Sequence, residues 1–355
     1  MTEAAAPDTD AGQGLLALSP AETEAAVVAL GGKRFHAKSI RRHVFERGVL
    51  DYAEMTDLSA ALREKLSHEL PILTGRELDR RRASDDTIKL LIERSDPRGR
   101  TDAVETVYIP SRKRGQGATL CVSTQVGCPV RCPFCASGKL GLERNLTRAE
   151  ILEQYVRGAA EGPLSRTVVM GIGEPLLNLP ALLPALEVVN REMGLGARKI
   201  TVSTVGFPER LRALADQKPA FQLAISLHTP DQEQRNTLVP AMDGVPIEDV
   251  LAAGDYWFEA TGREITYEYV LLGGVNDSPD HAAHLAERLR RRRATVNLIP
   301  YNPVPEDAYR RPHKQDVEAF RSFLEERRVV ATVRWSRGLE AAAACGQLRQ
   351  AHAAG

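Results

Sequence analysis

Cysteine is scarce in this chain, with five residues in 355. So few cysteines in so long a chain exclude a disulfide-dense secreted scaffold. Basic and acidic residues are equal in number, 47 each, so the net charge indicates no nucleic-acid partner and any such surface has to be local. The sequence also lacks the run of about eighteen apolar residues that a membrane-spanning helix requires, so we expect no membrane span.

The N-terminal stretch MTEAAAPDTDAGQG is small, acidic and rich in Pro and Gly, and no basic segment precedes an apolar one in it. This composition predicts a disordered tail over residues 1–18 and no signal peptide. Together with the few cysteines it favours a reducing, cytoplasmic location. The length allows one large domain, or one large and one small.

Residues 19–84 are predicted to form an N-terminal helical accessory domain. One helix is expected to start after Ser19 as N-cap, and others over residues 38–48 and from residue 59. Basic residues gather in this block: Lys33, Arg34, His36, Lys38, Arg41 and Arg42. Such a cluster is usually a solvated helix face. A surface that contacts RNA phosphates is the functional alternative, and both readings stay open here.

From residue 85 the period of apolar residues changes from helical to alternating. Residues 85–118 are predicted to be a β-hairpin linker, with strands near 87–93 and 103–110. Residues 119–355 then alternate strand-like and helical patterns, with strands expected to begin at Thr119, Thr167, Lys199, Phe221, Ile265, Ala294 and Val329. We therefore expect an α/β fold, a partial TIM-like β/α barrel whose chemistry lies at the carboxyl ends of its strands.

Four of the five cysteines lie within fifteen residues, and three of them, Cys128, Cys132 and Cys135, have spacings of four and three. Three thiolates on one loop can bind three irons of a [4Fe-4S] cluster and leave the fourth iron open to a ligand. The alternatives are a zinc site or reduced structural cysteines. A structural zinc normally has four protein ligands, and no second pair stands at a familiar spacing nearby.

Polar residues follow several of the expected strands. Gly173 and Glu174 follow the second strand of the barrel, and Ser203 lies at the end of the next. The remaining strand-end residues are Ser226 and His228, with Leu227 between them, and Asn302. Each alone is typical of a turn. Together they predict hydrogen-bonding groups for a nucleoside-bearing cofactor at one end of the barrel.

The cysteine loop, with Phe134 just before Cys135, resembles the radical S-adenosylmethionine (SAM) superfamily, and the segment Gly171-Ile-Gly-Glu174-Pro resembles its GGEP element. The resemblance implies a [4Fe-4S] cluster whose open iron binds SAM and cleaves it to a 5′-deoxyadenosyl radical. It also implies that Glu174 meets the amino group of SAM.

A narrower resemblance comes from the segments ACGQL, GEPLLN, ISLH, GVNDS and NLIPYNP. With the N-terminal helices, they resemble the RlmN/Cfr family of ribosomal RNA adenine methyltransferases over about residues 35–348. The resemblance implies methylation of an adenosine ring carbon, most often C2 in 23S rRNA and also in tRNA. It assigns the methyl-carrying cysteine to Cys345, the cysteine that resolves the protein–RNA adduct to Cys121, and a proton acceptor to Glu105.

Other features leave open which adenine carbon is methylated, C2 or C8. The segment after Cys135, Ala136-Ser-Gly-Lys-Leu-Gly, resembles the enzymes that act on C8, whereas the residues around Glu105 resemble those that act on C2. Further basic candidates for RNA contact are residues 112–114 and 290–293. The implied partners are RNA and an electron donor such as flavodoxin or ferredoxin, and a monomer is favoured. A radical SAM enzyme for a small molecule and a non-catalytic iron–sulfur RNA-binding protein are the rivals, and neither gives Cys345 and Cys121 a role.

Overall fold

The computed structural model describes residues 14–95, 101–139, 141–304 and 308–348. Ten strands form one sheet in the order β1-β2-β3-β4-β7-β8-β9-β10-β11-β12, and β5 (Gln125–Gly127) pairs with β6 (Leu142–Asn145) in a separate ribbon. Apart from that ribbon, strand order follows chain order. This is the order expected when each crossover returns to the neighbouring position, as in a β/α barrel.

The parallel part of the sheet contains all seven strands that the sequence predicts for the barrel. They are β4 (Ala118–Cys121), β7 (Leu164–Val169), β8 (Ile200–Thr204), β9 (Gln222–Ser226), β10 (Ile265–Leu271), β11 (Ala294–Pro300) and β12 (Val330–Val333). Within the described ranges β12 pairs with β11 alone, so the barrel stays open. The predicted α/β fold with a partial barrel is confirmed.

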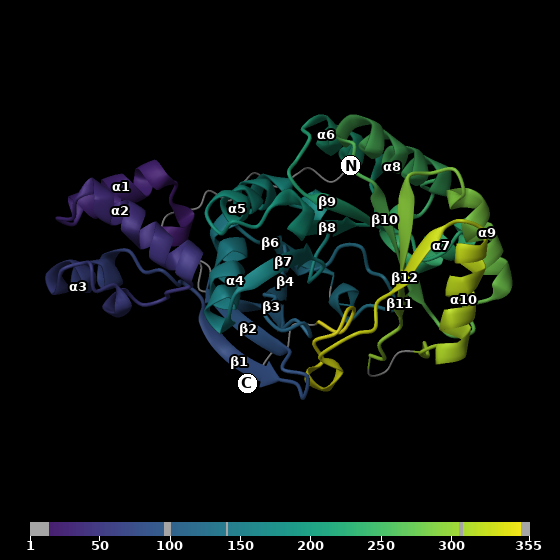
Figure 1. Ribbon diagram of the computed structural model, residues 1–355, viewed down its shortest axis with the longest axis horizontal. Helices are drawn as coiled ribbons and strands as arrows, with labels where there is room; N and C mark the ends of the chain where they lie inside the picture. Colours follow the sequence, from purple (N-terminus) through teal and green to yellow (C-terminus); the bar gives the residue numbers. More distant parts are fainter. Residues whose placement is uncertain (1–13, 96–100, 140, 305–307, 349–355) are drawn as a thin grey trace.

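Helices pack around the outside of the curved sheet (Figure 1). They are α4 (Arg148–Glu161), α5 (Leu179–Arg191), α6 (Pro208–Asp216), α7 (Gln232–Leu238), α8 (Ile247–Thr261), α9 (Pro279–Leu289) and α10 (Lys314–Glu326). Short helical turns η4 (Ala136–Gly138), η5 (Pro175–Leu177), η6 (Ala197–Lys199), η7 (Pro240–Met242) and η8 (Leu339–Ala341) lie in the connections. No helix in the described part of the chain is long and apolar enough to cross a bilayer.

The predicted hairpin forms from β2 (Ile88–Ser95) and β3 (Thr101–Ile109), and β3 continues antiparallel onto β4. A further strand, β1 (Arg76–Arg82), pairs with β2. The prediction that residues 19–84 are helical is therefore wrong for this segment. Its charged sequence RELDRRR hides the alternating period. Charged residues suit an edge strand, because they discourage pairing with another chain.

The N-terminal helices α1 (Pro20–Ala29), α2 (Arg34–Arg41) and α3 (Ala60–Glu69) stand beside the barrel (Figure 1). Between α2 and α3 lie the π-helical turn η2 (Arg42–Glu46) and the turn η3 (Tyr52–Glu54). Ser19 caps α1 as predicted, in a capping box with Glu22.

Of the predicted tail, residues 1–13 lie outside the described residues. Over residues 14–18 the prediction is wrong. Leu15 and Leu16 are buried in the core and belong to a short turn, η1 (Leu15–Ala17). Two adjacent leucines can gain enough from burial to order such a segment.

The N-terminal basic cluster is not one continuous face. Arg34 and Arg42 are exposed, but the Arg41 side chain is only 7% exposed and forms a two-bond ion pair with Glu192, just beyond α5. Arg41 also donates to Thr23 Oγ1 and to the Leu18 carbonyl oxygen. Arg41 therefore joins the N-terminal helices to the barrel, and it is unavailable to RNA phosphate.

Candidate active site

The loop that carries three cysteines is framed by the β5–β6 ribbon. Gly127 has φ +74°, and a Cβ there would lie 1.9 Å from the Gly141 carbonyl oxygen, so only glycine allows the two strands to approach. The Cys128 amide donates to that same oxygen at 2.8 Å, and the Cys135 amide donates to the Cys132 carbonyl at 3.1 Å. Backbone bonds therefore close the loop so that its three thiols face one side.

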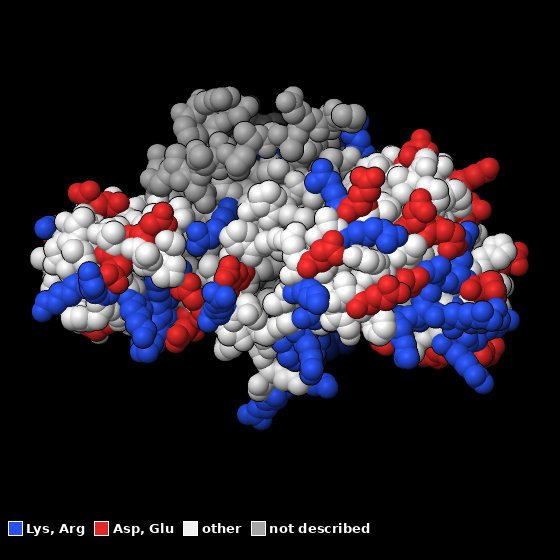
Figure 2. Space-filling view, turned by 90° about the horizontal axis from the view of Figure 1, so that it is seen from above, with Lys and Arg blue, Asp and Glu red and all other residues white. Residues whose placement is uncertain are grey.

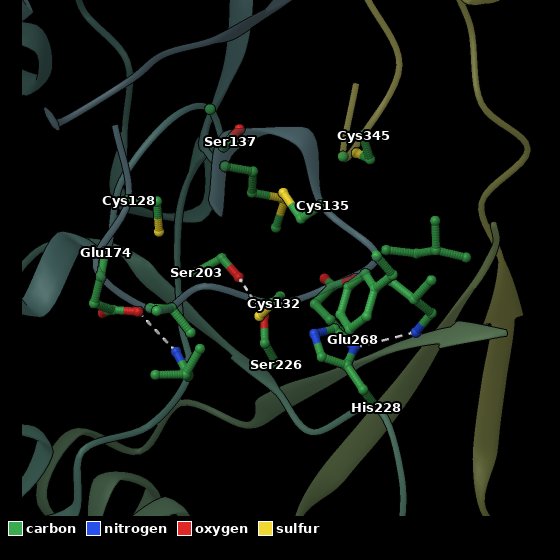
Figure 3. Close-up of a pocket in the computed structure, with 18 of the residues that line it drawn as sticks. Cys128, Cys132, Cys135, Ser137, Glu174, Ser203, Ser226, His228, Glu268 and Cys345 are labelled. Carbon is green, nitrogen blue, oxygen red and sulfur yellow. Dashed lines mark hydrogen bonds between the residues drawn. The ribbon is translucent and has the colours of Figure 1, made fainter. Parts of the chain in front are cut away.

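The thiols of Cys128, Cys132 and Cys135 line a cavity of about 920 Å³ at the carboxyl ends of the parallel strands (Figure 3). All five cysteines are free. In the described ranges no three Cys, His, Asp or Glu side chains converge closely enough to hold a single metal ion. Thiols spread around one cavity fit a multi-iron cluster better than a single zinc, because each thiolate binds a different iron.

The electrostatics of the thiols agree with this assignment. Burial, with smaller contributions from the charges of Cys135 and Glu174, raises the pKa of Cys128 to about 12. Bound iron would offset this cost, because a coordinating thiol is deprotonated by the metal. Arg235 is fully buried, its Nε and Nη1 atoms have no hydrogen-bond partner, and its charge acts on Cys132. This cation would balance the negative charge of an iron–sulfur centre held by three thiolates.

Glu174 lies beside Cys128 on the same cavity wall (Figure 3). Its carboxylate accepts hydrogen bonds from Thr204 Oγ1 at 2.5 Å, from the Val205 amide at 2.9 Å and from the Leu176 amide at 3.0 Å. Gly173, with φ +110°, allows this approach, since a Cβ there would lie 2.7 Å from Gln125 Cβ. The carboxylate is held rigidly at a position where it can accept a bond from a ligand ammonium group.

The other predicted polar residues lie deeper in the cavity. Ser203 Oγ and Ser226 Oγ are 3.4 Å apart, at the ends of β8 and β9. His228 has φ +64°, and its Nδ1 accepts from the Val270 amide at 3.2 Å. Burial lowers the pKa of His228 to about 3, so the ring is neutral. Leu227 is buried outside the cavity lining and contributes an amide that donates to the Glu268 carbonyl.

Cys345 reaches the same cavity from the C-terminal segment, across from Glu174 (Figure 3). Asn302 Nδ2 donates to the Cys345 carbonyl at 3.0 Å. The Ala136 amide donates to the Gly346 carbonyl at 2.8 Å, and Ser137 Oγ donates to the Leu348 carbonyl at 2.7 Å. Three bonds therefore fasten a segment more than 200 residues away in sequence to the barrel and its cysteine loop.

Cys121 lies at the end of β4 and lines a second cavity of about 840 Å³, which adjoins the first. Cys345 lines both cavities. Burial raises the pKa of Cys121 to about 12, with a smaller contribution from Cys345, whereas the positive charge of Arg334 lowers it. The structure thus brings together the two cysteines that lie outside the three-cysteine motif.

Glu105 lies outside the lining of both cavities. Its buried carboxylate forms an ion pair with Lys89 at 2.7 Å, and Lys89 also donates to the Ala342 carbonyl at 3.2 Å. Glu105 is therefore connected to the Cys345 segment through one lysine, and its role as proton acceptor stays a prediction.

Three residues in or next to the cavities were not found by the sequence analysis. Gln125 Oε1 accepts from the Glu174 amide at 2.7 Å. Glu268 lines the first cavity from β10, and burial raises its pKa to about 7. Arg334 follows β12 and lines the second cavity. A charged residue within an apolar strand, as in Ile265-Thr-Tyr-Glu268-Tyr, was the available signal for Glu268.

The fold and the three-cysteine loop define a radical SAM enzyme. Residues 122–286 match the Radical SAM superfamily, whose members use a [4Fe-4S] cluster and SAM. Residues 13–72 match the ribosomal RNA large subunit methyltransferase N-terminal domain.

Similar proteins show which family of radical SAM enzymes this chain resembles. The chain is 43% identical over 342 residues to a probable dual-specificity RNA methyltransferase RlmN of Nostoc punctiforme, covering 94% of this chain and 93% of that one. It is 44% identical over 341 residues to the similarly named protein of Thermosynechococcus vestitus, with 95% and 98% covered. A solved radical SAM methyltransferase from Sphaerobacter thermophilus superposes with a TM-score of 0.87 at 39% identity, with 95% and 99% covered. This chain belongs to the RlmN family of radical SAM RNA methyltransferases.

Proposed function

We propose that this protein methylates a ring carbon of an adenosine, C2 in 23S rRNA and also in tRNA, through a methyl group carried on Cys345. The observation that carries the proposal is that Cys345 lines two adjoining cavities, one with the three cysteines of the loop and one with Cys121. An RNA substrate is supported by the relatives, whose names specify a dual-specificity RNA methyltransferase. The matched N-terminal domain supports large-subunit rRNA.

In the first cavity, Cys128, Cys132 and Cys135 would hold the cluster, and Glu174 would accept hydrogen bonds from the amino group of SAM. Ser203, Ser226, His228 and Asn302 supply polar groups at neighbouring strand ends for the rest of that molecule. When bound, the cluster and SAM supply methyl groups and a carbon radical that can remove a hydrogen atom from a methyl group.

The two remaining cysteines, Cys345 and Cys121, have different roles in the reaction of the substrate. Cys345 takes the methyl group on its sulfur and, after losing a hydrogen atom from that group, joins the base through the methyl carbon. The adduct then becomes closed-shell by giving up one electron, for which the oxidised iron–sulfur cluster would be the acceptor when bound, and the proton of the base carbon. The Cys121 thiolate then attacks the Cys345 sulfur. A disulfide forms, the carbon–sulfur bond breaks, and its electron pair stays with the carbon, which takes up a proton. A thiol reductant must reopen the disulfide before the next turnover. Covalent catalysis is needed because adenine C2 is not nucleophilic.

Two further roles belong to the same proposal. Glu105 would accept the proton that the base loses, acting from its ion pair with Lys89. RNA phosphates would meet exposed basic groups such as Arg112, Lys113 and Arg114. Figure 2 shows Lys and Arg side chains projecting from one face, interleaved with Asp and Glu. RNA would therefore be attracted by local groups of basic side chains and not by the net charge of the chain. We further propose a flavodoxin- or ferredoxin-type electron donor.

The proposal is tested by mass spectrometry of methylated adenosines in rRNA and tRNA from a deletion strain and from the same strain carrying the gene. The expected result is a C2-methylated adenosine that returns with the wild-type gene and is absent with Cys345→Ala. A C8-methylated product would move the assignment to the other carbon. Identical nucleoside profiles in the two strains would refute RNA methylation by this chain.

A further inference from the structure

The two cavities differ in which functional groups they contain. Cys135, Met170, Gly171 and Cys345 line both, and Cys121 lines only the second. Glu174, Ser203 and His228 line only the first. If SAM occupies the first cavity, as the proposed function requires, the base has to meet the methyl group of Cys345 in a place where the Cys121 sulfur can still reach the Cys345 sulfur. The second cavity, which both cysteines line, is that place.

The second cavity has an aromatic side chain at its edge. Trp335 lines it and is 42% exposed, although large aromatic side chains are usually buried to a greater extent. The Arg311 guanidinium lies over the ring, 5.9 Å from its centroid, and Arg311 Nη1 donates to Asn302 Oδ1 at 3.4 Å. Since Asn302 also binds the Cys345 carbonyl, these contacts connect the ring with the methyl-carrying cysteine.

The neighbouring residue provides a cation. Arg334 is partly buried, and its backbone amide bonds to the Leu298 carbonyl at 2.8 Å, which continues the pairing of β12 with β11. Its Nη1 atom donates to Met170 Sδ at 3.4 Å, a weak acceptor. In the part of the chain that the structure describes, no carboxylate lies within ion-pairing distance of Arg334, although the charges of Cys345 and Glu268 raise its pKa. A guanidinium whose side-chain hydrogen bond goes to a weak acceptor is suited to a ligand that presents stronger acceptors.

The rest of the lining favours a base over a phosphate. Ile109, Met170, Ala343 and Leu348 give the cavity apolar walls. The lining contains two guanidinium groups, and one of them, Arg337, is already ion-paired with Asp85 at 3.0 Å. An apolar slot with one aromatic ring and one guanidinium left for a ligand, that of Arg334, matches a purine, which has two flat faces and acceptor nitrogens on its edge. An adenine inside folded RNA cannot reach Cys345 while it is stacked, so it has to leave the stack first.

We propose that Trp335 and Arg334 form the receiving pocket for the flipped-out adenine. Trp335 stacks on the base, and Arg334 donates a hydrogen bond to one of its ring nitrogens. Both side chains then determine which base reaches the S-methyl group of Cys345. The inference rests on the proposed function, because that function assigns SAM to the first cavity and the base to the second.

Tryptophan fluorescence gives a test that needs no turnover. The protein has two tryptophans, and Trp257 is completely buried, so acrylamide should quench mainly Trp335. Unmodified 23S rRNA from the deletion strain is the probe. In the wild-type protein, RNA should reduce the quenching of Trp335 fluorescence by acrylamide. In Trp335→Phe, RNA should not change the quenching. If RNA binds but leaves acrylamide quenching of the wild-type protein unchanged, the stacking role is refuted.

Kinetic measurements distinguish the loss of a stacking contact from a general loss of structure in the variants. Trp335→Ala should lower kcat/KM for the rRNA by about tenfold to a hundredfold, the equivalent of one lost stacking contact. Trp335→Phe keeps a ring and should stay within about threefold, and Arg334→Gln should lower kcat/KM at unchanged melting temperature. The matched control is Leu339→Ala, which removes a side chain of similar exposure, 41%, outside both cavities.

Methylation of Cys345 in cells serves as the second readout, because that step needs no RNA base. Trp335→Ala and Arg334→Gln should keep the added methyl mass on the Cys345 peptide. Wild-type protein that neither carries this mass nor methylates RNA would refute the proposed function. If the wild-type protein is active and Trp335→Ala has the same kcat/KM as Leu339→Ala, the receiving pocket is refuted while the proposed function stands.

Discussion

Arg41 offers the sharpest test of how the N-terminal helices are attached. By sequence it belongs to a basic cluster that RNA phosphates could contact, and by structure it is buried against the barrel. Replacing it with Ala removes two bonds to Glu192, at 2.6 and 2.8 Å, and the bonds to Thr23 and Leu18. The stacking of its guanidinium 4.9 Å from the Phe45 ring is also lost.

The size of the effect follows from burial. Removing one partner of a fully buried ion pair costs about 3–5 kcal/mol. Glu192 is 24% exposed, so water partly solvates it after the change. We therefore expect Arg41→Ala to lower the free energy of unfolding by about 2–3 kcal/mol. Arg42→Ala is the matched control: its side chain is 55% exposed, its Glu46 partner lies 3.7 Å away, and its loss should cost about 0.5 kcal/mol or less.

Urea denaturation, followed by far-UV circular dichroism, measures both variants. A double-mutant cycle with Glu192→Ala isolates the pair, and its coupling energy should be at least about 1 kcal/mol. The reasoning would be refuted if Arg41→Ala were as stable as Arg42→Ala. If it were also weaker in RNA binding with a shallower salt dependence, Arg41 would instead be a phosphate contact.

The remaining predictions concern the cavities. Cys121→Ala should fold, methylate Cys345 and accumulate protein covalently joined to RNA, seen as a nuclease-sensitive gel shift; normal turnover without an adduct would contradict the two-cysteine mechanism. Cys132→Ala should lose the visible iron–sulfur absorbance after anaerobic reconstitution, and a full cluster in that variant would contradict the ligand assignment. The pKa of Glu268, raised to about 7 by burial, means that the folded protein holds a proton that the unfolded chain releases near pH 4.5. The stability of wild type relative to Glu268→Gln should therefore fall as pH rises from 5 to 8, and a difference independent of pH would contradict a buried carboxyl.

Local chemistry and the class of fold could be predicted from the sequence. Short apolar runs predicted all seven parallel strands, because a strand buried on both faces needs consecutive apolar residues. The Ser19 cap followed from the side-chain oxygen that an N-terminal helix position requires. Spacing was sufficient for the three-cysteine loop, since its residues are close in the chain and need no distant partner to come together.

Contacts between groups that are distant in the sequence could not be predicted, because they depend on how the whole chain packs. Cys345 is 210 residues from Cys135, and its place in the cavity depends on three hydrogen bonds to other parts of the chain. Arg41 has the same local sequence features as Arg42, and a single carboxylate, Glu192, makes one of them structural. Glu268 in β10 and Arg334 just after β12 line the cavities because the curved sheet encloses the space that they face. Periodicity specifies which side chains share a face of a strand, whereas packing against the rest of the chain specifies what that face meets.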